Sequence, residues 1–384
     1  MNAWLIGSLC LVVAVALLLP VWLKWQRIGW QLGTYLTVML LVAGAGAMLW
    51  IANRSVEHFL NIPYVIGMLG MSLAGIAAFV GVVEFAILRT IGSTQLGAIA
   101  RVTYYEGLLQ PFTLIVLGSG IAVIGVCARL GFFTYYEDFK MYRDVAASFV
   151  FLFAMPVMVF ASSKVIDEEI DNRTMLTLMS KPVSRTQVVL GKYLGVVLLV
   201  LVAVGALGIW GMMCSYLRYF DDMMIDYRVA SGSQEIARLN FENTKAIFAI
   251  IPSLVLTFMQ VSALAAVSVA ISTRFGLAVN ITVVVLIYIT ANLASFLVNS
   301  QDVSGPVQTV VSLFAYLLPG LTQLDLNQRL IFGGYSLGAN DWAPNTPTYG
   351  AIWRYVALAG TYTVLYVGAV LSFGVAMFRT RELS

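Results

Sequence analysis

The residues that usually perform covalent or metal chemistry are few in this chain of 384 residues. His58 is its one histidine, so any mechanism that needs two imidazoles is excluded. Cys10, Cys127 and Cys214 lie in or at the edge of apolar runs without paired spacing, which supports neither a disulfide framework nor a thiolate metal site. The sequence lacks both His-Glu-x-x-His and Gly-x-Ser-x-Gly, which argues against a metal-dependent or serine intramembrane protease.

The sequence also lacks a phosphate-binding loop. Its one Gly-Lys step is Gly191-Lys192, and the loop pattern requires glycine where this chain has Thr186 and serine or threonine where it has Tyr193. We therefore expect that this chain does not bind ATP in the usual way and holds no metal or other cofactor.

Charged residues gather in one short segment, residues 164–181. Moving each charge into a bilayer costs about 2.5–3.5 kcal/mol, so the segment must lie outside the membrane. Apolar residues nevertheless recur in it at helical spacing, which predicts an amphipathic helix. The charged residues are Lys164, Asp167, Glu168, Glu169, Asp171, Arg173 and Lys181, and the apolar ones are Ile166, Ile170, Leu176 and Met179.

A membrane helix follows this segment almost at once. Pro182 ends the charged helix, and Ser184 with Gln187 forms a capping box that starts the next helix. A charged helix, an elbow (Pro182, Ser184 and Gln187) and a membrane helix therefore come in direct succession, and a force on the first would move the third. The alternative interpretation is an ordinary solvated loop helix.

The amino-acid composition indicates whether the chain is a soluble or a membrane protein. Hydrophobic residues make up 60% of the chain and charged residues 11%, against roughly a quarter charged in soluble domains. The chain is therefore expected to be an all-α polytopic membrane protein. Its net charge of +3 is too balanced to suggest a nucleic-acid partner.

A helix needs about 20 mostly apolar residues to cross a bilayer. We expect the first candidate to be a retained helix because no charged start or cleavage site marks it as a signal peptide. The segment Val307–Leu318 is too short to cross and is expected to be re-entrant or interfacial. Nine stretches qualify: Trp4–Leu23, Gln31–Ala52, Pro63–Leu88, Phe112–Leu130, Val145–Ser163, Gly191–Met213, Ala246–Ile271, Phe275–Val298 and Trp353–Phe378.

Lysine and arginine in the short loops predict the orientation. The segment after Ser163 carries four of them, and alternation places the loops at 24–27, 89–101 and 274, and the tail at 379–381, on the same cytoplasmic side. The N-terminus is then outside and the C-terminus inside the cytoplasmic (inner) membrane. The longest polar loops, 214–245 and 299–352, are external.

Residues 95–110 are predicted to form a helix on the membrane surface, in contact with lipid. Its polar face consists of Thr103, Glu106 and Gln110. Arg101 lies at the apolar edge of this helix, where its side chain is expected to snorkel.

In the eighth span, polar residues share about a third of the circumference: Asn280, Tyr288, Asn292 and Ser295. They either line a substrate path or subunit interface, or form interhelical hydrogen bonds worth about 0.6 kcal/mol each. Gly191 and Gly195 make a small-xxx-small pair typical of close helix packing.

The segment Glu168–Arg185, EEIDNRTMLTLMSKPVSR, followed by LGKYLG at 190–195, resembles the signature of ABC-2 type transporter permeases. Two weaker features agree with it, Leu318-Pro319-Gly320-Leu321 and the terminal Phe378–Leu383. The resemblance covers about residues 96–384. It implies a permease domain over 94–384 with six membrane helices, an interfacial helix and a cytoplasmic coupling helix at 164–181. It does not explain the three-helix N-terminal extension, residues 1–93.

The resemblance also implies partners. A separate ATP-binding subunit would bind and hydrolyse ATP with Mg²⁺, and would grip the coupling helix, while this chain would not be an enzyme itself. A second permease chain, identical or homologous, is expected in each transporter, with a family-level lean towards export. The ATPase-contacting residues would be Glu168, Glu169, Asp171, Arg173, Thr174, Thr177 and Lys181.

Two other functions stay open. An ion-coupled secondary transporter would need buried mid-span acids and paired broken helices, and mid-span acids are missing from the sequence. The second alternative is a membrane scaffold that uses an ATPase to pull on an external partner and transports nothing.

Overall fold

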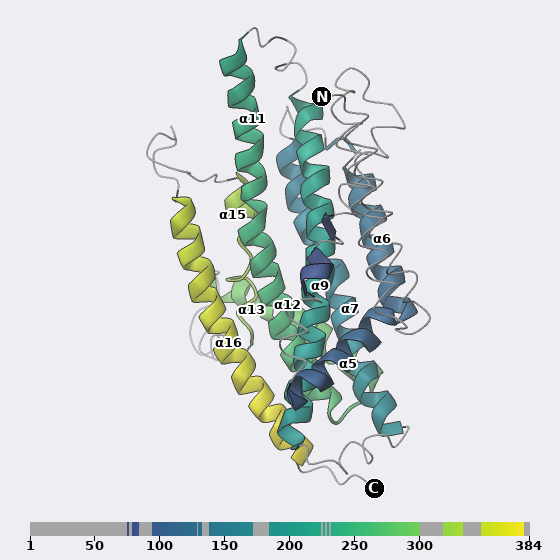
Figure 1. Ribbon diagram of the computed structural model, residues 1–384. Coiled ribbons are helices and arrows are strands. Elements are labelled where there is room, and N and C mark those ends of the chain that lie inside the picture. The colour runs from purple at the N-terminus through teal and green to yellow at the C-terminus, as the bar shows by residue number, and fades with distance from the viewer. Residues whose placement is uncertain are drawn as a thin grey trace, which may run out of the picture.

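A computed structural model of the chain describes residues 75–76, 79–83, 94–128, 130–132, 138–171, 184–223, 226, 229, 232–299, 318–332 and 347–379. The regular structure of these residues is helical, in long helices that run along one another while α5 crosses them obliquely near one end (Figure 1). The expectation of an all-α multi-pass protein is confirmed. The helices are α5 (Gln95–Leu109), α6 (Pro111–Cys127), α7 (Asp138–Asp171), α9 (Arg185–Asp222), α11 (Ser233–Phe248), α12 (Ile250–Ser272), α13 (Leu277–Asn299), α15 (Asn327–Phe332) and α16 (Tyr349–Arg379).

The core lies where α7, α9 and α12 pack together. Leu199, Leu207 and Leu264 are fully buried, and the apolar run of α9 contacts α5, α6, α7 and α12. Short described pieces of the third predicted span also pack on α9. Val83 is buried beside Leu198 and Leu199 there. The only role that this contact gives to the N-terminal extension is packing.

Four helical stretches of the described residues are each long and apolar enough to cross a membrane: 138–163, 186–219, 234–272 and 349–378. They contain the predicted fifth, sixth, seventh and ninth spans. The predicted fourth span is α6, which reaches the required length only together with α5, and the pair is bent by 62°. The predicted eighth span lies on α13, a helix of 23 residues, of which Leu277–Leu293 form an apolar helical stretch. The first two spans, and most of the third, lie outside the described residues, so the count of nine stays a prediction.

The bend between α5 and α6 has a local cause. Pro111 occupies the first turn of α6, and the proline ring pushes the preceding residue into the extended region. Gln110 has φ −63° and ψ 130°, so the chain changes direction there. The predicted end of the surface helix at Pro111 is confirmed.

Residues 214–245, predicted as an external loop, are largely helical. The helix α9 runs on to Asp222 and α11 begins at Ser233. Ala249, which joins α11 to α12, keeps helical angles (φ −65°, ψ −28°), so 234–272 forms 39 helical residues in succession. At 1.5 Å per residue this is about 58 Å, about twice the hydrocarbon thickness of a bilayer. Figure 1 shows α11 extending beyond the other helices.

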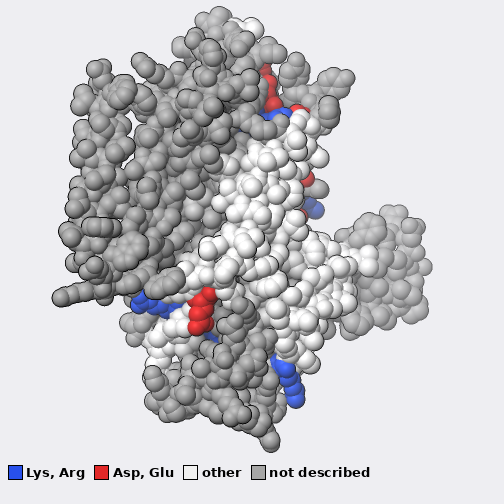
Figure 2. All heavy atoms as spheres, turned by 90° about the vertical axis from the view of Figure 1, so that its right-hand side faces the viewer, with Lys and Arg blue, Asp and Glu red and all other residues white. Residues whose placement is uncertain are grey.

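The outer surface of α16 is apolar. One narrow row of its residues is buried, from Ile352 and Val356 to Leu371 and Phe378. The other faces expose Leu358 (69%), Val364 (71%), Leu365 (75%) and Phe373 (65%). Figure 2 shows a different face, the one on the right-hand side of Figure 1, where charged side chains of the described residues lie around the margins of a broad uncharged area. Such a surface suits lipid, in agreement with a protein that crosses a membrane.

Candidate functional site: the end of α7 and the start of α9

The charged segment begins as an uninterrupted continuation of α7. This helix has 34 residues and passes from the apolar stretch, which ends at Ser163, through to Asp171 without a break. Residues 164–171 lengthen it by about 12 Å. Glu168, Glu169 and Asp171 therefore stand on the same rod as the fifth span. Arg173, Thr174, Thr177, Lys181 and Pro182 lie outside the described residues.

The next helix starts at a fixed point after the elbow. The Gln187 amide N–H donates to the Ser184 hydroxyl (3.2 Å), and the Ser184 amide N–H donates to the Gln187 side-chain oxygen (2.9 Å). The predicted capping box is therefore present at the start of α9. It satisfies two amide groups that a helix leaves without intrahelical partners. In Figure 1 this start lies at the same end of the bundle as the end of α7, α5 and the C-terminus.

We predict that Ser184→Ala loosens the first turn of α9. Loss of a serine cap costs about 1 kcal/mol, so amide hydrogen exchange at residues 186–188 should become about fivefold faster. Ser184→Thr, which keeps a capping hydroxyl, is the control. Equal exchange in all three proteins would contradict a role of this box in fixing the helix start.

The same part of α9 packs closely on α5. A Cβ atom on Gly195 would lie 2.5 Å from the Thr103 Cβ and 2.6 Å from the Ala100 carbonyl oxygen. A Cβ on Gly191 would lie 2.9 Å from the Ile99 Cβ. The close packing predicted from this glycine pair is confirmed, and it requires two residues without side chains.

This contact changes the faces predicted for α5. Thr103, expected on a polar face with Glu106 and Gln110, is only 3% exposed because it packs on Gly195. Glu106 is exposed and Gln110 half-buried. The Arg101 guanidinium lies 5.7 Å from the ring centre of Tyr105. The assignment of α5 to the membrane surface stays a prediction, with Val102 and Leu109 exposed on its outer side.

We predict that Gly195→Ala forces α5 away from α9. Overpacking of this kind costs about 1–3 kcal/mol, and here one of the blocking atoms is a backbone oxygen that cannot rotate away. The loss would be measured as a lower free energy of unfolding in detergent. Gly118→Ala on α6 is the matched control, since nothing lies within 4 Å of its Cβ position. An unchanged stability in Gly195→Ala would contradict the close contact.

A cluster of neutral polar side chains lies just before the charged segment. Ser162 and Ser163 of α7, Ser268 of α12 and Asn280 of α13 are each at most 1% exposed. The two Oγ atoms of Ser162 and Ser268 are 2.5 Å apart. The Asn280 amide nitrogen donates to Ser163 Oγ (2.5 Å) and to Ser268 Oγ (2.8 Å). The helix α7 thus meets α12 and α13, which lie more than a hundred residues further along the chain, through hydrogen bonds.

The other polar residues predicted to share one face of the eighth span (the polar stripe: Tyr288, Asn292 and Ser295 with Asn280) make different contacts. The Tyr288 ring stacks on Phe151 of α7 at 5.1 Å. The Asn292 amide nitrogen donates to the Tyr288 carbonyl in its own helix (2.9 Å). The Ser295 side chain is outside the described residues. These contacts are those of helix packing, and the role of the stripe as a substrate path or subunit interface stays a prediction.

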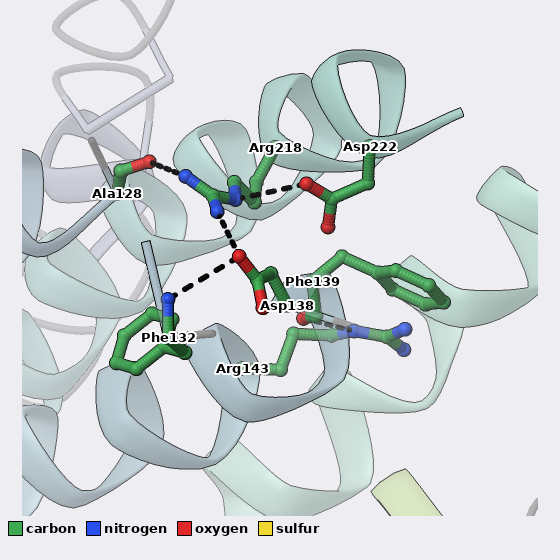
Figure 3. A network of polar contacts seen from close by, with 7 residues as sticks. All are labelled: Ala128, Phe132, Asp138, Phe139, Arg143, Arg218 and Asp222. Atoms are coloured by element: carbon green, nitrogen blue, oxygen red, sulfur yellow. Dashed lines mark hydrogen bonds and ion pairs between the residues drawn. The ribbon is translucent and has the colours of Figure 1, made fainter. Parts of the chain in front are cut away.

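Away from the charged segment, charged residues hold the start of α7 to the end of α9 (Figure 3). The Arg218 guanidinium lies 2.7 Å from Asp138 and 3.2 Å from Asp222, and it donates to the Ala128 carbonyl (3.1 Å). Asp138 also accepts from the Phe132 amide (3.2 Å). Burial raises the pKa of Asp222, and the charge of Arg218 opposes that rise. Arg218 lies in the segment 214–245 that the sequence predicts as an external loop, so this group is not among the predicted sites, although the four-residue spacing of Arg218 and Asp222 is a visible signal of a helical ion pair.

We predict that Arg218→Met destabilises the protein by about 3–5 kcal/mol, because it leaves two nearly buried carboxylates without their cation. The pKa of Asp222 would then rise further, because the charge that opposes its rise is lost. The folded form would bind more protons than the unfolded one, so the free energy of unfolding should fall as the pH rises above about 3.9, the ordinary pKa of aspartate.

The control is Arg238→Met, an exposed position on α11. The comparison would use denaturant unfolding in detergent at several pH values. A loss in Arg218→Met no larger than in the control would contradict a stabilising role for this group.

Residues 108–278 match the family model described as ABC-2 family transporter protein. The matched range runs from the end of α5 to the start of α13 and includes the charged segment. A comparison with curated proteins finds no match to the chain. The family supplies the membrane component of transporters and generally pairs with an ATP-binding subunit.

Proposed function

We propose that this chain, which carries an ABC-2 family transporter domain at residues 108–278, is the membrane-spanning permease subunit of an ATP-driven transporter. The observation that carries the proposal is the position of the charged segment. It begins on the end of one membrane-crossing helix, α7, and is followed by the capped start of another, α9. A partner that holds this segment therefore holds both helices.

The work would come from a separate ATP-binding subunit. That subunit would bind ATP and Mg²⁺ and contact residues 164–181, and this chain would bind neither and would not be an enzyme. Closure of the partner on ATP would push on residues 164–171. Because these residues belong to α7, the push would tilt α7 directly and α9 through the elbow at 182–187.

The remaining parts of the proposal concern assembly and direction. Two permease chains, identical or homologous, would form one transporter in the cytoplasmic membrane. The positive residues of the short loops favour an external N-terminus and a cytoplasmic charged segment. Export is the direction that we propose.

Reversal of two charges in the segment tests the assignment. Glu168→Lys/Glu169→Lys should lower the recovery of a nucleotide-binding subunit, and of ATPase activity, with the purified chain by about tenfold or more. Two interfacial carboxylates are replaced by like charges in this variant, and such pairs cost several kcal/mol. The readout is the mass of co-purified protein and vanadate-sensitive phosphate release.

Glu235→Lys/Glu242→Lys is the matched control, with the same change of charge on the exposed face of α11. It should retain both subunit recovery and ATPase activity. Equal recovery in both double variants, or no nucleotide-binding subunit with the unaltered chain, would overturn the proposal. A chain that instead moves solute on an ion gradient without ATP would be a secondary transporter.

A further inference from the structure

The cluster of Ser162, Ser163, Ser268 and Asn280 lies where a push on α7 would arrive. Ser162 and Ser163 are the last two residues before the charged segment. Ser268 lies one turn before the end of α12, and Asn280 lies in the first turn of α13. The turn at 273–276 connects these two helices. The cluster therefore joins the inner end of α7 to a hairpin more than a hundred residues away in sequence.

The two serine hydroxyls of α7 donate within their own helix, and their oxygens accept from the neighbouring helices. The hydroxyls of Ser162 and Ser163 both donate to the Val159 carbonyl, at 3.0 and 2.9 Å. Their oxygens are then left to accept, from the Ser268 hydroxyl and from the Asn280 amide respectively. The second hydrogen of that amide goes to Ser268. Both amide hydrogens and all three hydroxyl hydrogens are thus used, while the Asn280 amide oxygen is buried without a hydrogen-bond partner.

Burial makes these bonds difficult to break. No side chain of the cluster is more than 1% exposed, so water cannot replace a lost partner without entry into the core. A separated donor would remain unsatisfied in an apolar environment. Hydrogen bonds also depend on distance and angle, so they resist the sliding that apolar contacts permit. The cluster favours movement of the three helices as one body.

We propose that these four residues form a joint, the serine–asparagine joint, which makes the α12–α13 hairpin follow the inner end of α7 when the ATP-binding subunit pushes on residues 164–171. Asn280 is the positioning residue of the joint, because its amide alone contacts both α7 and α12. The proposal rests on the function proposed above and adds a path for the push that bypasses α9.

Hydrogen exchange in the complex with the ATP-binding subunit tests the joint without a known substrate. In the unaltered complex, ATP with vanadate should change amide exchange both at residues 164–171 and at the hairpin turn, 273–280. In Asn280→Leu, the change at 164–171 should persist, while the change at 273–280 should fall about fivefold or more. The difference between nucleotide states is not altered by a uniform loss of stability.

Thr282→Val is the matched control on the same helix, because the Thr282 hydroxyl bonds only the Ala278 carbonyl of α13. It should retain both changes. If Asn280→Leu does not assemble, Ser163→Ala removes one acceptor of the joint and should weaken the response at 273–280 selectively.

The outcomes separate the two proposals. A response at 164–171 with none at 273–280 in the unaltered complex would overturn the joint alone, as would a full response at both places in Asn280→Leu and in Ser163→Ala. No nucleotide response at 164–171 in the unaltered complex would overturn the proposed function itself.

Discussion

A helix of 34 residues is longer than a bilayer is thick, and this constraint shapes both ends of α7. At 1.5 Å per residue α7 measures about 51 Å, against about 30 Å of hydrocarbon. Some of its length must therefore lie in water, and the charged residues at its two ends, up to Asp144 and from Lys164 on, decide which parts do. The hydrogen bonds of one helix then connect the part from Lys164 onward to Ser162 and Ser163, while Pro156 interrupts these hydrogen bonds further along α7. A coupling segment joined by a flexible loop would lose motion at the loop.

The two ends of α7 are held by different chemistry. The end at Asp138 is held by an ion-paired arginine, in a group whose side chains are 10–15% exposed. The other end, at Ser162 and Ser163, is held by hydroxyls and one amide with almost no exposure. Charges are costly to bury in an apolar core, whereas hydroxyls and amides are tolerated there once they are hydrogen-bonded. Both ends of α7 are therefore fixed to other helices by directional contacts.

The sequence predicts the local features well. Apolar length alone locates the helices α7, α9, α12 and α16, and the Ser184 and Gln187 spacing predicts the cap, because both features depend on neighbouring residues only. The spacing of Gly191 and Gly195 predicts close packing, although not that α5 is the partner. Contacts between distant residues were not accessible. The sequence predicts a loop at Arg218 because a charge after an apolar run is typical of the end of a helix, and its partner Asp138 is eighty residues away.

Contacts between residues distant in the sequence also change the path by which force would travel. From the sequence alone, the path leads from the charged helix through Pro182 to α9, and a proline elbow is a compliant connection because the backbone hydrogen bonds are interrupted there. The structure shows that residues 164–171 are continuous with Ser162 and Ser163 of α7, so a path without a proline reaches these two residues, and Pro156 lies beyond them in the same helix. It branches at Ser162 and Ser163 to α12 and α13. The helix α9 is in turn bound to α5 through its two glycines. A single push on the charged segment can therefore reach four other helices, two by way of the α7 rod and two by way of the elbow.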